Sequence, residues 1–255
     1  MQSETMALFI EAWGQMTGAL PSPNHEVNGA VTNRLCDAPN LFFNLWIQNR
    51  PTPDEDAFRT MLGTGKSISE AWHHPSAGLL CVDWVPGNWE AILREEGLAL
   101  MLTMTGMHAH DIAAPSHPPA DIEIRKITDD KTARDAAMIN AHAYHMQESD
   151  FECCSGLFFW PDYTVGFVGY RDEEPVTTAT ARAVNGTVYV AMVATEPAME
   201  KKGYADTVMR HAIEAGRRHI GSDNITLHAT EAGQPTYERM GFKLGPVVAM
   251  VVPAG

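Results

Sequence analysis

The sequence predicts a mixed α/β fold in which helices flank a mostly antiparallel sheet. Two observations predict this class. Short apolar stretches with strand character are joined by tight-turn pairs, of which Asn185-Gly186 is the clearest. Longer stretches with a 3.6-residue hydrophobic period, such as the one after Gly203, alternate with these strands and are typical of amphipathic helices.

The first 115 residues show a mixed order of these two patterns. Helices are expected at residues 4–16, 53–62, 67–72 and 88–96, and strands at 40–48, 78–85 and 98–104. The prolines between residues 113 and 120 can sustain neither a helix nor a central strand, so we expect a linker there. The predicted domains are therefore residues 1–115 and 121–255.

The second domain opens with an alternating strand at residues 122–127, and Thr128-Asp129-Asp130 then caps a helix over 131–146. Three further strands follow, each joined to the next by a tight turn. These strands are expected at 163–170, 175–184 and 187–195. The remaining elements are a helix after residue 203, a strand at 225–230, a short helix at 235–240 and a last strand after 242.

The composition is that of a folded globular protein. Of the 255 residues, 45% are hydrophobic and 20% are charged, which allows a sizeable core in one large or two ordinary domains. The net charge of −14 argues against nonspecific binding to nucleic acid. The chain has no run of eighteen apolar residues and no basic start, so we expect neither a membrane span nor a secretion signal, and a cytoplasmic location.

No metal centre is predicted. The chain has four cysteines, at positions Cys36, Cys81, Cys153 and Cys154. Their spacing fits neither a metal site nor a disulfide framework. The pairs His73-His74 and His108-x-His110 have no carboxylate or cysteine at a supporting spacing, so surface or packing roles are expected for them.

The most informative segment is residues 188–205. An apolar strand ends at Pro197, and a short basic loop then opens directly into a helix. Gly203 lets the backbone approach a ligand closely, and Lys201 and Lys202 add positive charge. Because the free amides and dipole of a helix N-terminus attract anions, this segment predicts a site for a phosphate-bearing cofactor.

A second segment completes the pattern about thirty residues later. A strand at 225–230 precedes a short helix with Pro235 in its first turn, and Gly241-Phe242 ends that helix. Together, Thr195-x-Pro197 through Ala205 and Tyr237 through Phe242 resemble the GNAT superfamily of acyl-CoA-dependent N-acyltransferases. One position departs from the family pattern, because Glu200 stands where the family's phosphate loop usually begins with Gln or Arg.

The resemblance implies an N-acetyltransferase that moves the acetyl group of acetyl-CoA to the amine of a small molecule by direct attack in a ternary complex. By position in the family pattern, the cofactor would be held by Val193, Ala194, Thr195, Lys201, Lys202, Gly203, Tyr204, Ala205 and Asp206. Tyr237 would protonate the leaving thiolate, and Glu148 or Glu152 would serve as the general base. Glu196, Glu231, His145 and His228 are further candidates for the base.

The first domain resembles a degenerate half of the same fold, as in the tandem members of the superfamily, and the intact half is the second. The state expected is a monomer or homodimer, without a nucleic-acid or membrane partner. The acidic surface would suit a cationic acceptor, and surface acidity also serves solubility. Two alternatives stay open: transfer of a longer acyl or aminoacyl group, and an acyl-CoA-binding sensor without catalysis.

Overall fold

The computed structural model describes residues 2–115 and 117–254, which form two compact units. Unit 1 comprises the chain up to Met107, residues His228–Pro235 and the chain from Leu244 onward. Unit 2 comprises His108–Leu227 and Thr236–Lys243. The first change of unit therefore falls a few residues before the predicted linker. The end of the chain lies in unit 1, although the sequence places it in the second domain.

Unit 1 has a sheet whose strands follow the order β1-β2-β3-β4-β11-β5. These strands are β1 (Val27–Asn28), β2 (Val31–Arg34), β3 (Leu45–Gln48), β4 (Ala77–Cys81), β5 (Leu98–Ala109) and β11 (Lys243–Pro253). β3 and β4 are parallel, whereas β4 pairs antiparallel with β11, from Val248 opposite Cys81 to Val251 opposite Gly78. The last strand of the chain is thus a central strand of unit 1.

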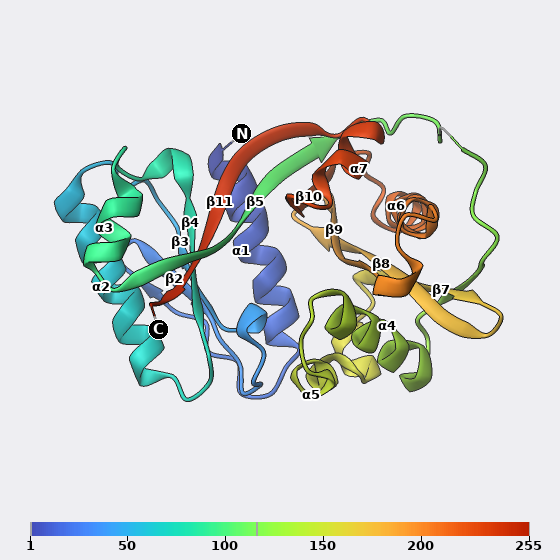
Figure 1. The fold of residues 1–255 in the computed structure, drawn as a ribbon, viewed down its shortest axis with the longest axis horizontal. Coiled ribbons are helices and arrows are strands. Elements are labelled where there is room, and N and C mark those ends of the chain that lie inside the picture. Colours follow the sequence, from blue (N-terminus) through green and yellow to red (C-terminus); the bar gives the residue numbers. More distant parts are fainter. Residues whose placement is uncertain (1, 116, 255) are drawn as a thin grey trace. The chain divides into compact units, whose positions relative to one another are not determined.

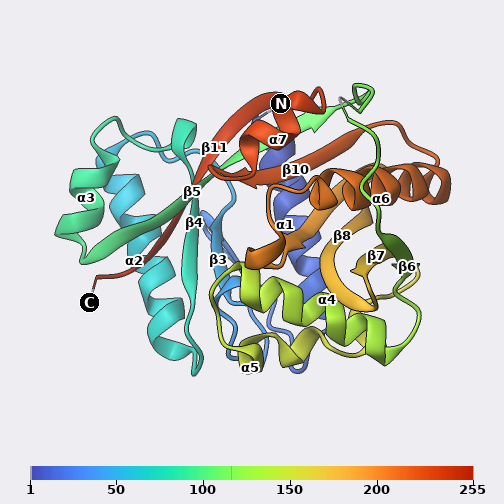
Figure 2. The same cartoon turned by 45° about the vertical axis from the view of Figure 1, so that its right-hand side comes forward.

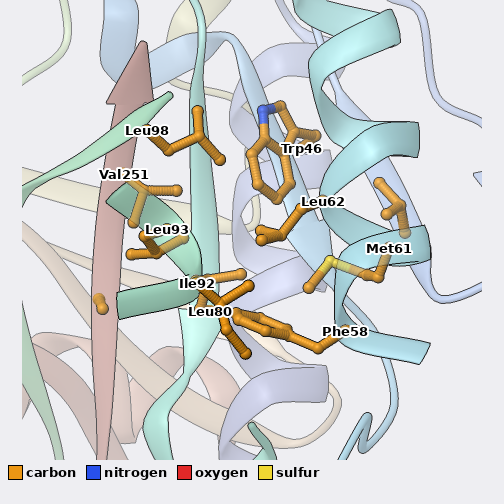
Figure 3. Packing of buried hydrophobic residues seen from close by; sticks show 11 residues of the cluster. Trp46, Phe58, Met61, Leu62, Leu80, Ile92, Leu93, Leu98 and Val251 are labelled. Carbon is orange, nitrogen blue, oxygen red and sulfur yellow. The ribbon is translucent and has the colours of Figure 1, made fainter. Parts of the chain in front are cut away.

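Helices cover both faces of this sheet, so its strands are apolar on both sides. α1 (Gln2–Gly18) packs Met6 and Phe9 against Leu45, Ile47 and Leu79. On the other face, α2 (Glu55–Ala71) and α3 (Trp89–Glu95) enclose Trp46, which Figure 3 shows among the side chains of this cluster. The indole lies so close to two glycines that a Cβ at Gly65 or Gly78 would come within 2.5 or 2.1 Å of it.

Unit 2 has the strand order β10-β9-β8-β7-β6. These strands are β6 (Glu123–Lys126), β7 (Thr164–Arg171), β8 (Glu174–Val184), β9 (Thr187–Thr195) and β10 (Ile225–Thr230). Only β10 runs parallel to its neighbour β9, while the pairs from β9 to β6 are antiparallel. Asn185-Gly186 forms the β8–β9 turn with positive φ at both residues, as the sequence predicts for a tight hairpin.

Two long helices, α4 (Asp130–Ala143) and α6 (Tyr204–Ile220), pack on opposite faces of β7 and β8 (Figures 1 and 2). Shorter helices, α5 (Glu148–Phe151) and α7 (Gln234–Arg239), follow the end of α4 and β10 respectively. On the α6 face, His211 packs edge-on against Phe167 of β7. The sheet of unit 2 therefore carries α4 on one side and the predicted phosphate-binding helix on the other.

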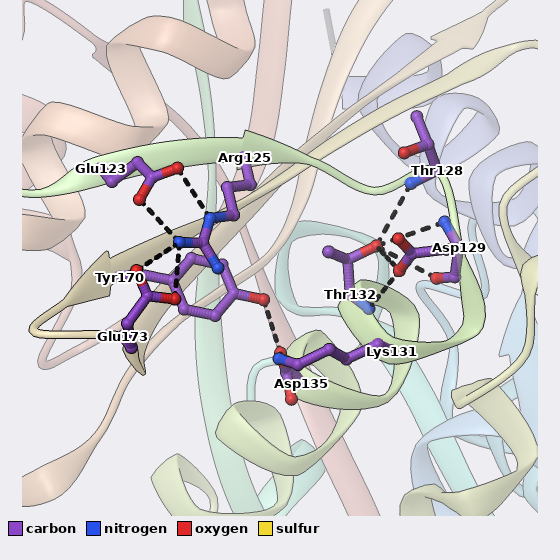
Figure 4. A network of polar contacts seen from close by, with 9 residues as sticks. All are labelled: Glu123, Arg125, Thr128, Asp129, Lys131, Thr132, Asp135, Tyr170 and Glu173. Carbon is purple, nitrogen blue, oxygen red and sulfur yellow. Dashed lines mark hydrogen bonds and ion pairs between the residues drawn. The ribbon is translucent and has the colours of Figure 1, made fainter.

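Polar contacts fix the start of α4 beside β6 and β7 (Figure 4). Tyr170 donates a 2.5 Å hydrogen bond to Asp135 of α4, and the guanidinium of Arg125 lies 4.3 Å from the centre of the Tyr170 ring. Arg125 also pairs with Glu123 and Glu173. Because both carboxylates are largely exposed, these ion pairs add little stability individually, but they orient Arg125 over the ring.

The observed elements agree with most of the predicted strands and helices of the second domain and differ more in the first. The two helices expected at 53–62 and 67–72 form one helix, α2, because Gly63 and Gly65 are accommodated inside it. The short strands β1 and β2 and the helix α5 were not expected, since each is too short to show a hydrophobic period. The predicted fold class, a mixed and mostly antiparallel sheet with flanking helices, is confirmed.

Candidate active site

A bulge interrupts β9 just before the predicted cofactor loop. Thr178 pairs with Ala194 and Thr180 with Ala191, so β9 has one residue more than β8 between these pairs. Met192 lies within the bulge and has a φ of +50°. Such a bulge leaves the extra residue without a ladder partner and bends the strand. The interruption thus falls within the part of the strand that is predicted to meet the acyl end of the cofactor.

β9 also separates from β10 at this end. The two strands pair at Ile225 opposite Val188 and at Thr226 opposite Tyr189, and β9 then continues to Thr195. The side chains of residues 191–193 are half-buried. Parallel neighbours that diverge create an opening beside the strand into which an extended ligand can bring its own hydrogen-bonding groups.

The turn after β9 presents the N-terminus of α6. A short 3-10 turn (Pro197–Met199) follows the strand, and Lys201 and Gly203 then adopt left-handed backbone conformations, with φ of +60° and +80°. Gly203 is exposed, and a Cβ built on it meets no atom within 4 Å. The left-handed backbone therefore favours glycine at position 203, although the space beside it could hold a side chain.

The amides of this turn are free. The N–H groups of residues 201–206 make no hydrogen bond to any other residue within 2–115 and 117–254, and the N-cap Gly203 offers no side chain to them. Unpaired amides at a helix start cost free energy unless water or a ligand satisfies them, and the helix dipole adds positive potential there. A diphosphate fits this arrangement of donors.

The two lysines predicted to add positive charge lie beside the helix start, whereas two arginines of α6 are engaged elsewhere. Lys201 and Lys202 are exposed beside it, and the Lys202 ammonium lies 3.2 Å from the Ala198 carbonyl oxygen. Arg210 instead pairs with Asp206 at 2.8 Å and donates to the Ala113 carbonyl, while Arg217 donates to the His110 carbonyl. These two arginines tie residues 110–113 to α6. The Asp206 carboxylate is thus engaged by Arg210, and the backbone amide is the group of Asp206 that remains available to a cofactor.

Arg171 is a basic residue near the loop that the sequence argument missed. Its guanidinium donates a 2.9 Å hydrogen bond to the hydroxyl of Tyr204, the first residue of α6. Tyr204 is buried, so its ring anchors the helix start while Arg171 remains half-exposed. The sequence gives no signal for this contact, because Arg171 is the last residue of β7 and lies 33 positions before Tyr204 along the chain.

Tyr237 lies on α7, where its ring packs against Phe242 at a centroid distance of 6.1 Å. Burial raises the pKa of the Tyr237 phenol, and the nearby Tyr144 adds to the increase. Tyr144 is the C-cap residue of α4, and its side chain keeps 42% of its surface exposed. At neutral pH the Tyr237 hydroxyl is therefore protonated and able to donate a proton.

A carboxylate–imidazole cluster joins the end of α4 to the end of β9. His142 Nδ1 lies 2.8 Å from a carboxylate oxygen of Glu196, and His142 Nε2 lies 3.0 Å from one of Glu148. The two hydrogen bonds raise the pKa of His142 above its ordinary value, with Glu148 contributing most. The structure thus brings together two of the candidate bases, Glu148 and Glu196. His142 was not predicted, because a histidine inside a helical pattern has no distinguishing sequence signal.

The other candidate bases have different surroundings. Glu152 pairs with Arg134 of α4 at 2.9 Å and accepts a hydrogen bond from Ser155. His228 lies in unit 1, where its ring packs edge-on against Phe9, and burial lowers its pKa to about 3. Glu231 is an exposed residue of unit 1. These surroundings make Glu152 a partner in a surface ion pair and His228 a neutral core residue.

Aromatic side chains are exposed on the segment between α4 and β7. Phe158 keeps 58% of its surface exposed, while Phe151 and Phe159 of the same segment are buried. Arg182, a fully buried residue of β8, donates to the Phe159 carbonyl at 3.1 Å and so holds this segment against the sheet. Exposed aromatic faces near acidic groups can bind an organic cation through cation–π contacts.

A bulged strand leads into an uncapped helix N-terminus, and a protonated phenol and a carboxylate–imidazole cluster belong to the same unit; this arrangement fits an acyl-CoA-dependent acyltransferase. Residues 132–242 match the family model described as the acetyltransferase (GNAT) family. The resemblance predicted from the two motifs is confirmed, and the matched family is one of acetyltransferases. No curated protein matches the chain.

Solved structures of the same fold extend over nearly the whole chain. A GCN5-related N-acetyltransferase from Kribbella flavida has a TM-score of 0.70 at 20% identity, covering 98% of this chain and 96% of its own. A GCN5-related N-acetyltransferase-like protein from Streptococcus suis has a TM-score of 0.56 at 13% identity, covering 99% of both chains. A tandem GNAT protein from the clavulanic acid biosynthesis pathway has a TM-score of 0.55 at 12% identity, covering 99% and 95%. At these identities the likeness concerns the fold.

Within residues 2–115 and 117–254, no helix has both the length and the apolar character needed to span a membrane.

Proposed function

We propose that the protein is an N-acetyltransferase that moves the acetyl group of acetyl-CoA to the amine of a small molecule by direct attack in a ternary complex. The observation that carries this proposal is the set of free amides at the start of α6, residues 201–206. These donors, the left-handed Gly203 and the exposed Lys201 and Lys202 suit a diphosphate group.

The cofactor would lie along β9, beyond the residues that pair with β10. In this proposal, residues 201–206 hold the diphosphate through their amides, and the main chain of Val193, Ala194 and Thr195 holds the pantetheine arm. Acetyl-CoA supplies the acyl group in activated form, as a thioester. Donors that are fixed before the reaction stabilise the developing negative charge on a carbonyl oxygen, typically by about 3 kcal/mol each. The bulge at Met192 is the feature that would free such donors.

The acceptor amine must lose a proton before it can attack. We assign this role to the cluster of Glu148, His142 and Glu196. Glu148 is exposed and takes a proton from the ammonium group, while the hydrogen-bonded imidazole of His142 stabilises the transfer by sharing that proton. Glu196 accepts from the other ring nitrogen and stabilises the imidazolium, as the carboxylate does in other carboxylate–histidine pairs. Glu148 keeps the role expected from the sequence, and the proposal leaves Glu152 in its ion pair with Arg134.

Tyr237 is proposed as the proton donor to the departing thiolate. Its raised pKa keeps the phenol protonated at neutral pH. The acceptor is proposed to be a small cationic amine, because the base cluster contributes two carboxylates and the exposed rings of Tyr144 and Phe158 belong to the same unit. Residues 1–115 are proposed to be the degenerate half of a tandem arrangement, and we assign no catalytic residue to them.

The two ends of α6 provide a matched test. Gly203 and Gly221 both have left-handed backbones, with φ of +80° and +71°, and a Cβ on either meets no atom within 4 Å. Substituting alanine at either position costs a similar conformational strain of about 1 kcal/mol. Only Gly203→Ala places a methyl group among the free amides. We expect Gly203→Ala to weaken acetyl-CoA binding in calorimetry by about tenfold, and Gly221→Ala to leave it unchanged.

Turnover is measured by release of free thiol from acetyl-CoA with a panel of small amines. Turnover with at least one amine supports the proposal. Tight acetyl-CoA binding without turnover across the panel would favour an acyl-CoA-binding sensor. Faster turnover of a longer acyl-CoA would favour transfer of a longer acyl group. If Gly203→Ala and Gly221→Ala affect binding equally, the assignment of the diphosphate to the start of α6 is wrong.

A further inference from the structure

Unit 1 brings Asp37 together with two adjacent histidines that lie 36 and 37 positions later in the chain. Asp37 lies in the loop after β2, while His73 and His74 follow the end of α2. The Nε2 atoms of His73 and His74 lie 3.0 and 2.8 Å from the same oxygen, Oδ1 of Asp37. One ligand-type atom from each of the three residues falls within 4.8 Å of the other two.

A buried asparagine holds the two segments in register. Asn44 is fully buried, and its Oδ1 accepts hydrogen bonds from the Cys36 amide at 3.0 Å and from the Trp72 indole at 2.9 Å. Its Nδ2 donates to the Ala38 carbonyl at 2.7 Å. Asn44 therefore fixes the residues on both sides of Asp37 and also the residue that precedes His73.

The two imidazoles are oriented as a pair. Neighbouring side chains in a chain often point apart, yet the rings of His73 and His74 lie with their centroids 4.3 Å apart. The Trp72 ring packs against His73 at 4.8 Å, so the aromatic packing limits how far this imidazole can turn. Both rings direct Nε2 to the carboxylate, which is the arrangement of a preorganised ligand set.

We propose that Asp37, His73 and His74 form a binding site for a divalent transition-metal ion, of which Zn²⁺ fits the donor set best. Two imidazole nitrogens and one carboxylate oxygen are a common set of protein ligands for zinc, with one position left to water or another ligand. The remaining position faces accessible space, because the three side chains keep 50%, 60% and 21% of their surfaces exposed. His74 also borders an open hollow of about 350 Å³ in unit 1.

The spacing of the three ligand atoms is close to what a metal requires. Ligand atoms about 2.0–2.1 Å from a tetrahedral zinc ion lie about 3.3 Å apart. The observed distances to Asp37 Oδ1 are 2.8 and 3.0 Å, so these two spacings have to widen by a few tenths of an ångström, while the two histidine nitrogens, which lie within 4.8 Å of each other, have to reach the same spacing. Exposed side chains can make that adjustment by rotation, while Asn44 keeps the backbone in place.

The sequence argument against a metal at His73-His74 relied on the absence of a nearby carboxylate. Asp37 supplies that carboxylate from another segment, and the contact depends on the fold of unit 1 rather than on spacing along the chain. This site does not depend on the proposed acetyl transfer, and it can be tested independently.

The test uses the full-length protein without a histidine tag, after metal removal by chelation. Zn²⁺ is titrated by calorimetry and Co²⁺ by visible absorption, whose intensity reports a low coordination number with nitrogen and oxygen ligands. We expect one ion per chain in both titrations. Asp37→Asn and His74→Asn should each weaken the binding by about tenfold or more, since loss of a ligand should cost at least as much as loss of a supporting contact.

Two controls keep the result interpretable. His110 lies 3.6 Å from Asp111 and forms a histidine–carboxylate pair without a third ligand, so His110→Asn should leave the affinity unchanged. Asn44→Asp preserves size but cannot donate to the Ala38 carbonyl, and it should weaken Zn²⁺ binding while the three ligands stay present. Circular dichroism verifies folding of each variant. Unchanged affinity in folded Asp37→Asn and His74→Asn, or no saturable ion in the wild type, would overturn the proposal.

Discussion

The N-termini of α4 and α6, two helices of the same unit, are completed in different ways. At α4, the Asp129 carboxylate accepts from the Thr132 amide at 2.8 Å, and Thr132 Oγ1 accepts from the Asp129 amide at 3.4 Å. At α6, Gly203 offers no side chain and the amides of residues 201–206 are free. A helix start that satisfies itself is structural, whereas one that leaves its donors free is suited to an external anion.

The opposite ends of the two helices strengthen the contrast. α4 brings His142 in its last turn to Glu148 and Glu196, and the negative end of a helix dipole favours an imidazolium there. α6 ends at the left-handed Gly221, whose amide donates to the Arg217 carbonyl. In the proposed enzyme, α6 therefore binds with its first turn and α4 contributes chemistry with its last.

The largest effect is expected at the end of α4. Because general acid–base groups typically contribute 10²–10⁴-fold, His142→Gln should lower kcat by about 1,000-fold, and Glu148→Gln should also lower it strongly. Glu152→Gln is the matched control, since Glu152 pairs with Arg134 instead. Steady-state thiol release measures all three. A larger loss in Glu152→Gln than in Glu148→Gln would move the base to the other carboxylate.

The same cluster predicts a pH dependence. Glu148 and Glu196 raise the pKa of His142 above its ordinary 6.5, so kcat should rise with pH through a midpoint above 6.5. Glu148→Gln should move that midpoint down. Stability should change with pH in the opposite direction to kcat. The two hydrogen bonds to the imidazolium stabilise the fold fully below pH 6.5, and this contribution is lost as the pH rises through the raised pKa of His142. NMR titration of the His142 ring measures its pKa directly.

Tyr237→Phe is expected to have the next largest effect, about a hundredfold on kcat. The loss falls at the low end of the range for proton donors because a thiolate is a good leaving group and needs little help. The affinity for acetyl-CoA, measured by calorimetry, should stay within about twofold. An equal loss of turnover and affinity would mean that Tyr237 positions the cofactor and does not donate the proton.

Converting the start of α6 into one like that of α4 should affect binding alone. Gly203→Asp introduces a carboxylate that can cap the free amides and repel a phosphate, and we expect about 30-fold weaker acetyl-CoA binding from a loss of about 2 kcal/mol. Gly203→Asn, which also tolerates a left-handed backbone, separates capping from charge. If Gly203→Asp binds acetyl-CoA as tightly as Gly203→Asn does, electrostatic repulsion at this helix start plays no part.

The contrast between the two helices also shows which features the sequence could predict. The cap of α4 and the loop before α6 were predictable, because both depend on residues a few positions apart. The Asn185-Gly186 hairpin was predictable for the same reason. Contacts between distant segments were not: His142 meets Glu196 across 54 positions, and Asp37 meets His74 across 37. The place of β11 in unit 1 was missed because a final apolar strand carries no information about its partner.

The smallest effect is expected where α4 begins, and it should appear in stability alone. Asp129→Ala removes the cap, and losses of this kind lower the melting temperature of a protein of this size by about 2–4 °C. Hydrogen bonds from Thr132 lower the pKa of Asp129, so the stabilisation is present above the ordinary value of 3.8 and is lost as pH falls through the lowered pKa. The difference in melting temperature between wild type and Asp129→Ala should therefore be full at neutral pH and shrink in acid. Acetyl-CoA affinity should not change, because the proposed diphosphate site lies at the start of α6 and not at the start of α4. A variant that lost affinity without losing stability would reverse the roles assigned to the two helices.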